Sequence, residues 1–377
     1  MKMDYASERA AAIRAVELAS VVCATVFDSL NRESQVNTKP DQSPVTIADY
    51  AAQAIIIDAL KDQFPDIAFI AEEDSTMLRL PSSTSMCDAI LSLVHKVKKM
   101  SLEDILDNID RGSSEGGPQG KYWVLDPIDG TKGFVGGRQY ALCLGLVVDG
   151  VAVMGVLGCP NYCPSESVVQ SIDGSNADKK HGSLFVAVVG QGAFLRRLRL
   201  ILSDTEYSRI SGSEHEPKGK TVSITTDNNI DEQPISVSTT NDFGDAVFCE
   251  SVESGHTSHS LSASVAEKLN IVNPPMRMDS QCKYASVACG SMSGVDAYLR
   301  PPPSSKAGRH ENTWDHAAGC VIVSEAGGRV TDLLGQPLDF SCGRLLRNNV
   351  GVVCSNSVLH DRIIGATATT FSLSVST

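Results

Sequence analysis

The sequence predicts an α+β protein whose second half is more α/β in character. Two observations carry this prediction. Helical periodicity and short apolar runs are mixed in the first half, and beyond residue 235 strand-like runs alternate with helical segments. The 377 residues are 42% hydrophobic and 20% charged, a globular balance that can build a sizeable core. We expect an N-terminal domain at 1–205, a C-terminal domain at 235–377 and a mobile polar insertion at 203–234.

The expected elements follow from the spacing of apolar residues. Helical spacing predicts helices at 5–31, 47–63, 84–111, 257–269 and 314–326. Short apolar runs predict strands at 67–71, 122–125, 140–148, 151–157, 184–189, 192–198, 246–249, 284–289, 328–331 and 350–354. The Asp149-Gly150 pair between two of these runs indicates a β-hairpin.

The charge balance limits the partners. The chain carries a formal net charge of -13, which repels polyanions, so we expect no binding to polymeric nucleic acid or to an anionic membrane. A small anionic substrate is not excluded, because metal ions and a local basic cluster can reverse the field within one cleft. No stretch approaches the roughly 18 apolar residues of a membrane span.

The N-terminus and the cysteines favour a reducing compartment. Residues 1–30 mix charges with Ala and Val, which predicts an amphipathic helix rather than a signal or transit peptide. The eleven cysteines are odd in number, scattered and mostly set in apolar runs, which is typical of buried free thiols. We therefore expect a cytoplasmic protein, with an organelle left open. As a separate expectation, the protein is a monomer or a weak homodimer.

The most informative segment is WVLDPIDGTKGF at 123–134. A predicted strand ends at Asp126, Pro127 then forces a turn, and Asp129 follows. Two carboxylates so close on a turn repel each other unless a cation lies between them, and oxygen ligands without nearby His or Cys favour magnesium or manganese over zinc. Thr131 and the backbone beside it offer a hydroxyl and N–H groups for a phosphate. The alternative is an Asx-rich surface turn.

Two further acidic positions stand where such a site needs ligands. Asp315 lies in WDHAAG at 314–319, which opens an apolar helix, and by itself it could be only an N-cap. Glu72 begins a Glu-Glu-Asp run, which by itself could be a solvated charge run. Glu72 also follows a predicted strand, and active-site residues of α/β proteins gather at strand ends.

Together these motifs resemble a known family. DPIDGT at 126–131 with WDHAAG at 314–319 is similar to the signature pair of the inositol monophosphatase superfamily of lithium-sensitive, metal-dependent phosphatases. Its 3′(2′),5′-bisphosphate nucleotidase branch is resembled by DQSPVTIADY at 41–50, SEGG at 114–117, ESVESGH at 250–256, DSQCK at 279–283 and YLR at 298–300. The match runs in order over roughly residues 5–365. The resemblance implies a layered α-β-α-β-α sandwich.

The resemblance also implies roles for individual residues. It assigns two or three magnesium ions to Glu72, Asp126, the carbonyl of Ile128, Asp129 and Asp315. Activation of the attacking water falls to Asp49 and Thr131. The substrate contacts that it implies are Thr131, His256, Ser280, Lys283, Arg300 and Asp315. Ala71 stands where much of the superfamily has Gly, a difference that a small backbone shift absorbs.

The implied activity is removal of the 3′-phosphate of 3′-phosphoadenosine 5′-phosphate, with 3′-phosphoadenylyl sulfate as a further candidate substrate. Lys283 and Arg300 suit a second phosphate, although by themselves they could be a solvated basic face. An inositol mono- or polyphosphate 1-phosphatase is an alternative. A non-catalytic metal or nucleotide sensor is another, and the presence of every candidate metal carboxylate counts against it.

Three histidines are interpreted separately. His256 and His259 have a spacing that zinc ligands use, but no partner Cys or acidic pair completes such a site. We expect His256 to contact the base or sugar of the nucleotide, and His259 to be a surface residue. His316 is expected in the core or directly behind the site.

Overall fold

The structure, a computed structural model, describes residues 4–30, 37–38, 44–164, 181–200, 232–303 and 310–375. The helices are α1 (Ala6–Leu30), α2 (Ile47–Lys61), α3 (Thr84–Val94), α4 (Leu102–Asp110), α5 (Thr131–Val135), α7 (His259–Leu269), α8 (Cys282–Ala288), α9 (Gly290–Ser293), α10 (Ala317–Glu325) and α11 (His360–Val375). Short 3₁₀ helices lie at Pro81–Ser83, Thr313–Asp315 and Phe340–Cys342. The predicted insertion at 203–234 lies outside the described residues up to Asp231.

Two β-sheets form the framework. The seven-stranded sheet has the order β3 (Ala68–Ala71), β4 (Lys121–Asp129), β5 (Ala141–Val148), β6 (Val151–Cys159), β7 (His181–Val188), β8 (Gly192–Arg199) and β9 (Gln233–Pro234). Its β3 and β4 are parallel, and the later neighbours pair antiparallel. The five-stranded sheet has the order β11 (Met276–Met278), β10 (Phe248–Ser251), β12 (Ala297–Arg300), β14 (Val352–Asn356) and β13 (Gly328–Thr331), with β14 antiparallel to both of its neighbours. A separate hairpin joins β1 (Asn37–Thr38) to β2 (Pro44–Val45).

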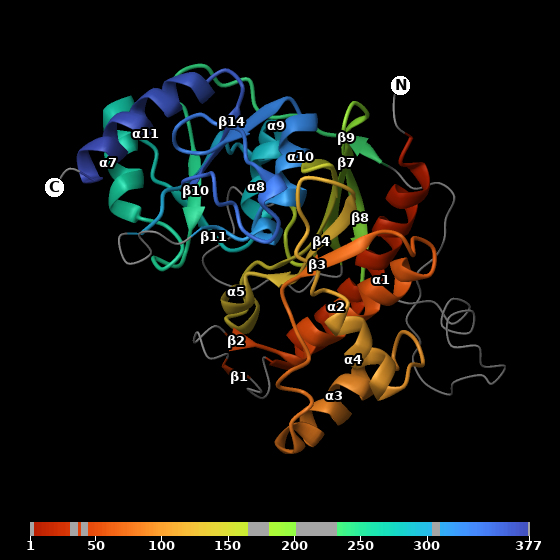
Figure 1. Cartoon of the computed structure of the whole chain (residues 1–377). Helices are drawn as coiled ribbons and strands as arrows, with labels where there is room; N and C mark the ends of the chain where they lie inside the picture. Colours follow the sequence, from red (N-terminus) through yellow and green to blue (C-terminus); the bar gives the residue numbers. More distant parts are fainter. Residues whose placement is uncertain are drawn as a thin grey trace.

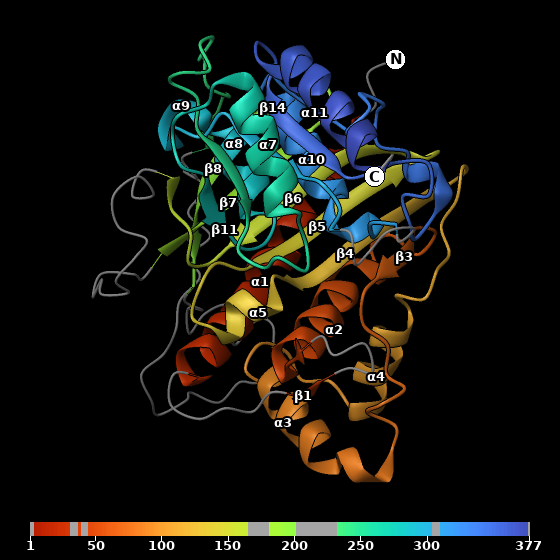
Figure 2. The same ribbon diagram turned by 90° about the vertical axis from the view of Figure 1, so that its left-hand side faces the viewer.

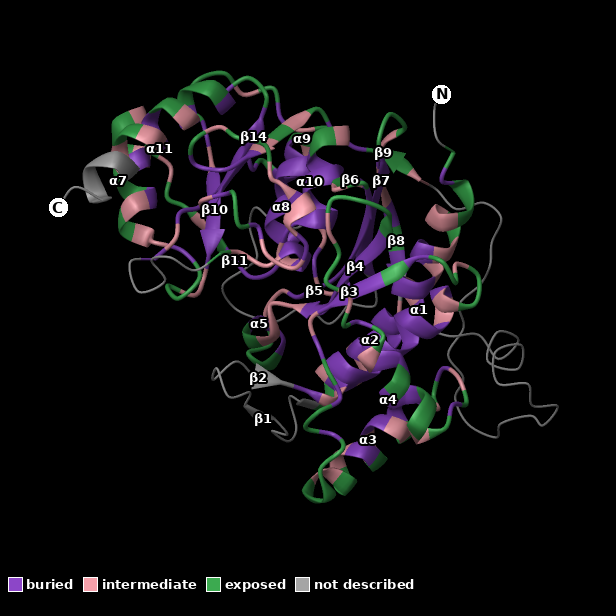
Figure 3. Ribbon diagram, in the orientation of Figure 1, coloured by how far each residue is buried: buried purple, intermediate pink, exposed green. Residues whose placement is uncertain are grey.

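Helices and sheets alternate in layers. α1 and α2 cover one face of the seven-stranded sheet, α8 and α10 lie between the two sheets, and α7 and α11 cover the outer face of the five-stranded sheet. Figure 1 shows this order from α1 and α2 toward the lower right to α11 at the upper left, and Figure 2 shows it from the side. The central strands and α10 are buried (Figure 3). The predicted α-β-α-β-α sandwich is confirmed.

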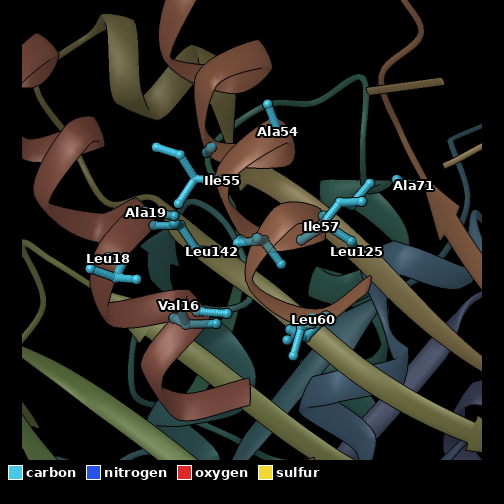
Figure 4. Packing of buried hydrophobic residues seen from close by; sticks show 14 of the residues in the cluster. Val16, Leu18, Ala19, Ala54, Ile55, Ile57, Leu60, Ala71, Leu125 and Leu142 are labelled. Atoms are coloured by element: carbon cyan, nitrogen blue, oxygen red, sulfur yellow. The ribbon is translucent and has the colours of Figure 1, made fainter. Parts of the chain in front are cut away.

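The first core lies between α1, α2 and the seven-stranded sheet. Figure 4 shows Val16 of α1, Leu60 of α2 and Leu142 of the sheet in this cluster, and all three are buried. Contrary to the sequence expectation, α1 is long and apolar enough to cross a membrane by length and composition alone. Most of it is nevertheless buried against α2 and the sheet, as in the core helix of a globular domain.

Between the sheets, α10 lies directly on β5 and β6 because both strands carry glycine at the contact. A Cβ on Gly155 would lie 2.2 Å from the Ala318 carbonyl oxygen, and a Cβ on Gly145 would lie 3.1 Å from the Ala317 Cβ. This close approach brings the 3₁₀ helix Thr313–Asp315, which precedes α10, against β4 and β5. Two strand glycines therefore help to set the position of Asp315.

Replacing Gly155 with Ala is expected to lower the free energy of unfolding by about 1–3 kcal/mol, because α10 must move away from β6. Gly365→Ala is the matched control, since Gly365 is exposed in α11 and nothing lies within 4 Å of an added Cβ. That control should gain up to about 1 kcal/mol from better helix propensity. Urea unfolding followed by circular dichroism measures both, and an unchanged Gly155→Ala protein would contradict the close packing.

Some predicted elements differ from the observed ones. The predicted helix at 84–111 is two helices, because Ser101 begins α4 with its own capping box. The predicted strand at 284–289 is wrong, since these residues fall mainly in α8. Every residue of α8 is buried, so the segment shows no helical alternation of apolar and polar positions. The predicted strand at 122–125 is longer and extends to Asp129.

Other expectations are confirmed. The Asp149-Gly150 turn joins β5 and β6, with φ values of 48° and 76° that match a hairpin turn. The eleven cysteines are free, and all except Cys163 and Cys342 are buried. The nine buried thiols therefore belong to the packing of the core.

Candidate active site

Asp126, Asp129 and Asp315 meet at one place. The two former residues lie at the end of β4, where the pairing with β5 shifts register between them. Pro127 has no N–H to give to the ladder, which favours this irregularity. Asp315 comes from the 3₁₀ helix before α10, and one carboxylate oxygen from each of the three aspartates lies within 4.8 Å of the others.

Glu72 leaves the neighbouring strand beside Asp126. The strands β3 and β4 are parallel, with Ala71 opposite Leu125. Glu72 and Asp126, which follow this pair in the two segments, are therefore neighbours. Gln53 of α2 holds the chain just beyond Glu72. Its Oε1 accepts the Glu73 N–H at 3.1 Å, and its Nε2 donates to the Glu73 carbonyl at 2.7 Å. These bonds hold the backbone just after Glu72, whose charge acts on Asp126. Glu72 is not part of the group of three aspartates whose oxygens lie within 4.8 Å of one another.

Burial and mutual repulsion make the cluster unfavourable when all its carboxylates are charged. Burial, followed by the charges of Glu72 and Asp129, raises the pKa of Asp126 well above its usual range. Burial and the charge of Asp315 raise the pKa of Asp129 to about 7. Asp126 is 2% exposed, and in the described part of the chain its Oδ1 has no hydrogen-bond partner. Converging carboxylates with such a buried oxygen fit a hard divalent cation, which would offset the repulsion.

Asp49 and Thr131 lie at two helix starts. The buried Asp49 carboxylate accepts hydrogen bonds from the N–H and the hydroxyl of Thr46, at 2.9 Å and 2.7 Å, in the capping box of α2. Its charge adds, after burial and the nearer carboxylates, to the rise in the pKa of Asp126. The Thr131 hydroxyl donates to the Ile128 carbonyl at 3.2 Å as α5 begins. Both residues therefore have a local structural role beside the acidic cluster.

Ser280 approaches the acidic turn closely. Gly130 has a φ of 85°, and a Cβ there would lie 2.9 Å from the Ser280 Cβ, so only glycine fits. Ser280 itself has a φ of 62°, which is uncommon for a non-glycine residue. The N–H of Gln281, the next residue, donates to the Asp129 carboxylate. The chain at Ser280 is thereby fastened to the end of β4.

Lys283 brings a buried positive charge to the same region. Its ammonium group donates to the Ser280 carbonyl at 2.6 Å and to the Met278 carbonyl at 3.3 Å, and it lies 5.4 Å from the centre of the Tyr298 ring. Burial lowers the pKa of Lys283, while the charge of Asp129 acts in the opposite direction. Lys283 therefore stiffens the turn at Ser280 and partly offsets the acidic cluster.

Arg300 connects the cluster to Glu311. Its Nη2 donates to Asp315 at 3.0 Å and to Glu311 at 2.6 Å, and among the described residues its buried Nε has no partner. Burial acts to raise the pKa of Glu311, but the charge of Arg300 and the contact with the His316 ring lower it overall. Glu311 thus shares the charge of Arg300 with Asp315. Glu311 could not be predicted from the sequence, because a single Glu in a Pro- and Ser-rich segment carries no motif.

The histidines occupy different environments. His256 is exposed in the loop after β10, where its backbone N–H donates to the Glu253 carbonyl at 3.0 Å. His259, expected at the surface, is half-buried, and its Nε2 lies 2.9 Å from the Ser251 carbonyl oxygen. His316 is fully buried with its Nδ1 at 2.7 Å from the Tyr284 hydroxyl, which confirms the expected core position.

Gln281 is a second residue that the sequence analysis missed. Its Nε2 donates to the Trp314 carbonyl at 2.8 Å, and its Oε1 accepts the Gly319 N–H at 3.0 Å. Together with its backbone bond to Asp129, these contacts join the end of β4 to the start of α10. Its place between Ser280 and Lys283 is the single signal in the sequence that pointed to it.

A rim of ion pairs, also missed, joins α5 to the loops that carry Ser280 and His256. Arg138 donates from Nε to Asp279 at 2.6 Å and from Nη2 to Glu253 at 3.2 Å. Lys132 of α5 lies 3.6 Å from the same Glu253 carboxylate. These contacts hold the loop after β10 against the acidic turn.

The model of the inositol monophosphatase family matches residues 4–370. This chain belongs to that family. Curated relatives include the 3′(2′),5′-bisphosphate nucleotidases of Emericella nidulans, 40% identical, and of Oryza sativa, 39% identical. The first alignment covers 97% of this chain and 98% of the relative, and the second covers 96% and 94%. The chain therefore matches these relatives over nearly their whole length.

Solved structures of more distant proteins share the fold. The extragenic suppressor protein suhB from Bartonella henselae aligns with a TM-score of 0.59 at 18% identity, covering 96% of this chain and 98% of that protein. The inositol monophosphatase from Anabaena (Nostoc) aligns with a TM-score of 0.56 at 19% identity and covers 96% of each chain. At these identities the likeness extends to the fold alone.

Proposed function

We propose that this chain is a magnesium-dependent phosphatase that hydrolyses the 3′-phosphate of 3′-phosphoadenosine 5′-phosphate, giving AMP and phosphate. The observation that carries the proposal is the cluster of Asp126, Asp129 and Asp315, whose oxygens lie within 4.8 Å of one another. The choice of substrate is supported by relatives at 36–40% identity over nearly the whole chain that bear the name 3′(2′),5′-bisphosphate nucleotidase.

The proposed metal ligands are Glu72, Asp126, Asp129, Asp315 and the carbonyl of Ile128. This donor set consists of oxygen atoms, which suits magnesium better than a softer metal. When bound, two or three such ions supply charge that offsets the phosphate and make a nearby water more acidic. Two positive charges partly offset the negative charge of the cluster. Arg300 donates to Asp315, and Lys283 lies where the charge of Asp129 acts on it.

Asp49 and Thr131 are proposed to activate the attacking water. The Asp49 carboxylate would accept its proton, and the Thr131 hydroxyl would orient it. The two hydrogen bonds from Thr46 support this role, because they hold the carboxylate in one orientation without neutralising it. The attack requires no covalent intermediate on the protein.

The remaining part of the nucleotide is proposed to contact His256, Ser280, Lys283 and Arg300. The 5′-phosphate would be bound by the Ser280 hydroxyl and by the Lys283 ammonium group, which lies at the same turn and donates to the Ser280 carbonyl. The buried Arg300 Nε supports a further polar contact, since among the described residues it has no partner. His256 is exposed in the loop after β10, which supports a contact with the base or the sugar.

The proposal extends to 3′-phosphoadenylyl sulfate, which carries the same 3′-phosphate. An inositol mono- or polyphosphate ranks second because it would leave the basic groups near Ser280 without an adenosine 5′-phosphate to bind. A non-catalytic sensor ranks third. The free cysteines are consistent with a reducing compartment, and we propose a cytoplasmic monomer or weak homodimer.

A substrate panel tests the function directly. With magnesium present, kcat/KM for 3′-phosphoadenosine 5′-phosphate should exceed that for inositol 1-phosphate by about 100-fold or more, because a site built for polar groups rejects a substrate that lacks them. Phosphate release and chromatography of the nucleotide product measure both the rate and the position of cleavage. The product should be 5′-AMP with adenosine nearly absent. Preference for inositol 1-phosphate would overturn the substrate assignment.

A further inference from the structure

Arg344 lies in a segment that packs against Thr313, two residues before Asp315 in the chain. Its carbonyl accepts the Thr313 N–H at 2.9 Å, and the Gly343 carbonyl accepts the Thr313 hydroxyl at 2.5 Å. Gly343 has a φ of 81°, and a Cβ there would lie 2.2 Å from the Glu115 carbonyl oxygen. The backbone at 343–344 therefore packs closely against Thr313, just before Asp315, and against Glu115, in the loop that leads to β4.

The Arg344 side chain points to the strand end that carries Glu72. Its Nη2 donates to the carbonyl of Ala71, the last residue of β3, at 2.7 Å. Its Nη1 donates to the carbonyls of Gly112 at 3.0 Å and Ser114 at 3.2 Å. Gly112 and Ser114 in turn bond to β3, since Ala71 N–H donates to Gly112 and Ser114 N–H to Phe69.

The same guanidinium group lies over Trp314, which is adjacent to Asp315 in the chain. The guanidinium carbon is 4.9 Å from the centre of the Trp314 ring. Arg344 thus contacts Ala71, next to Glu72, and Trp314, next to Asp315. We call this set of Ala71, Arg344 and Trp314 the arginine bridge.

The position of β3 explains why such a bridge matters. β3 is the edge strand of the seven-stranded sheet, and on its outer side the segment at 112–114 bonds to it in place of a further strand. Asp315 lies just before α10, in the helical layer between the two sheets, and not on the sheet that carries Glu72. Magnesium demands oxygen ligands at about 2.0–2.1 Å in near-octahedral geometry, so a small drift between the two carboxylates weakens binding.

We propose that Arg344 is a positioning residue that sets the separation between Glu72 and Asp315 for metal binding. A planar guanidinium can donate to three carbonyls and stack on an indole at the same time, whereas an ammonium group cannot. The proposal rests on the proposed metal-dependent function. It adds a residue that itself touches neither the ion nor the substrate.

Arg344→Lys is the test, measured first without substrate. Mn²⁺ binding followed by the electron paramagnetic resonance signal of free Mn²⁺ should be about tenfold weaker than in the parent protein, as for other residues that orient metal ligands. The magnesium concentration for half-maximal activity should rise by a similar factor. KM for the bisphosphate at saturating magnesium should change by less than about twofold, because the substrate groups are intact.

Trp314→Leu removes the stacked ring and keeps Arg344, so it tests the bridge if Arg344→Lys folds poorly. Its Mn²⁺ affinity should also fall, and the double variant should lose less than the product of the two single losses. Arg329→Lys is the control, because Arg329 is exposed on β13 and pairs with the exposed Asp361, and its Mn²⁺ affinity should be unchanged. Thermal melting checks that each variant is folded.

The outcomes separate the two proposals. Mn²⁺ affinity unchanged in folded Arg344→Lys or Trp314→Leu overturns the positioning role, as does a loss confined to KM for the nucleotide. If the parent binds Mn²⁺, Arg344→Lys binds it more weakly, and neither hydrolyses the bisphosphate, the positioning role stands and the proposed substrate is wrong.

Discussion

The Asp129→Asn variant should fold and lose metal-dependent turnover by roughly 10³-fold or more, because a charged ligand at the centre of the cluster is replaced by a neutral amide. The side-chain oxygen of Asn can still accept the Gln281 N–H, so the contact that fastens the turn is kept. The amide N–H₂ group would then face Asp126 and Asp315, where it cannot bind a cation. Near-normal phosphate release by this variant would refute the metal assignment.

The metal-free protein offers a second readout of Asp129. Its folded-state pKa of about 7 lies above the ordinary value of 3.8, so the folded state binds more protons than the unfolded state between these values. Without metal, the melting temperature should therefore fall as pH rises from about 4 to about 7. Asp129→Asn should reduce this slope, and magnesium should restore stability to the parent protein at neutral pH. Asp361→Asn, at an exposed ion pair, is the control for both activity and melting.

The Lys283→Ala variant should lower kcat/KM for 3′-phosphoadenosine 5′-phosphate by about ten- to a hundredfold, the value of a charge-assisted contact to a phosphate. Hydrolysis of 3′-AMP should change much less, because that substrate has no 5′-phosphate. The comparison of the two substrates separates lost binding from general damage to the site. Equal losses on both substrates would contradict a contact between Lys283 and the 5′-phosphate.

Two controls accompany Lys283. Lys283→Met keeps most of the buried stem and removes the charge, together with the hydrogen bonds to the Ser280 and Met278 carbonyls. It should match Lys283→Ala in substrate discrimination and melt at a higher temperature. Lys268→Ala removes an exposed lysine in the last turn of α7 and should leave kcat/KM for both substrates unchanged.

Local patterns predicted well where a single segment decides the outcome. The first two helices, the Asp149-Gly150 hairpin and the paired aspartates of the Asp126 turn all depend on residues close in the chain. The strand predicted at 284–289 failed because α8 is buried on every side, and without a polar face an apolar run does not distinguish a helix from a strand. The break in the predicted helix at 84–111 depended on one capping residue, Ser101.

The sequence by itself determined the family, the layered fold and the chemistry of the acidic cluster, because short motifs carry the carboxylates, the turn at Gly130 and the start of α10. Only the tertiary structure decided which distant residues hold these motifs together. Gln281 joins Asp129 to α10, and Arg344 joins Ala71 to Trp314. Such contacts depend on how the layers pack. That packing depends in turn on single residues such as Gly155, which allows α10 to approach β6 closely. Residues far apart in the chain leave no periodic pattern by which their meeting could be foreseen.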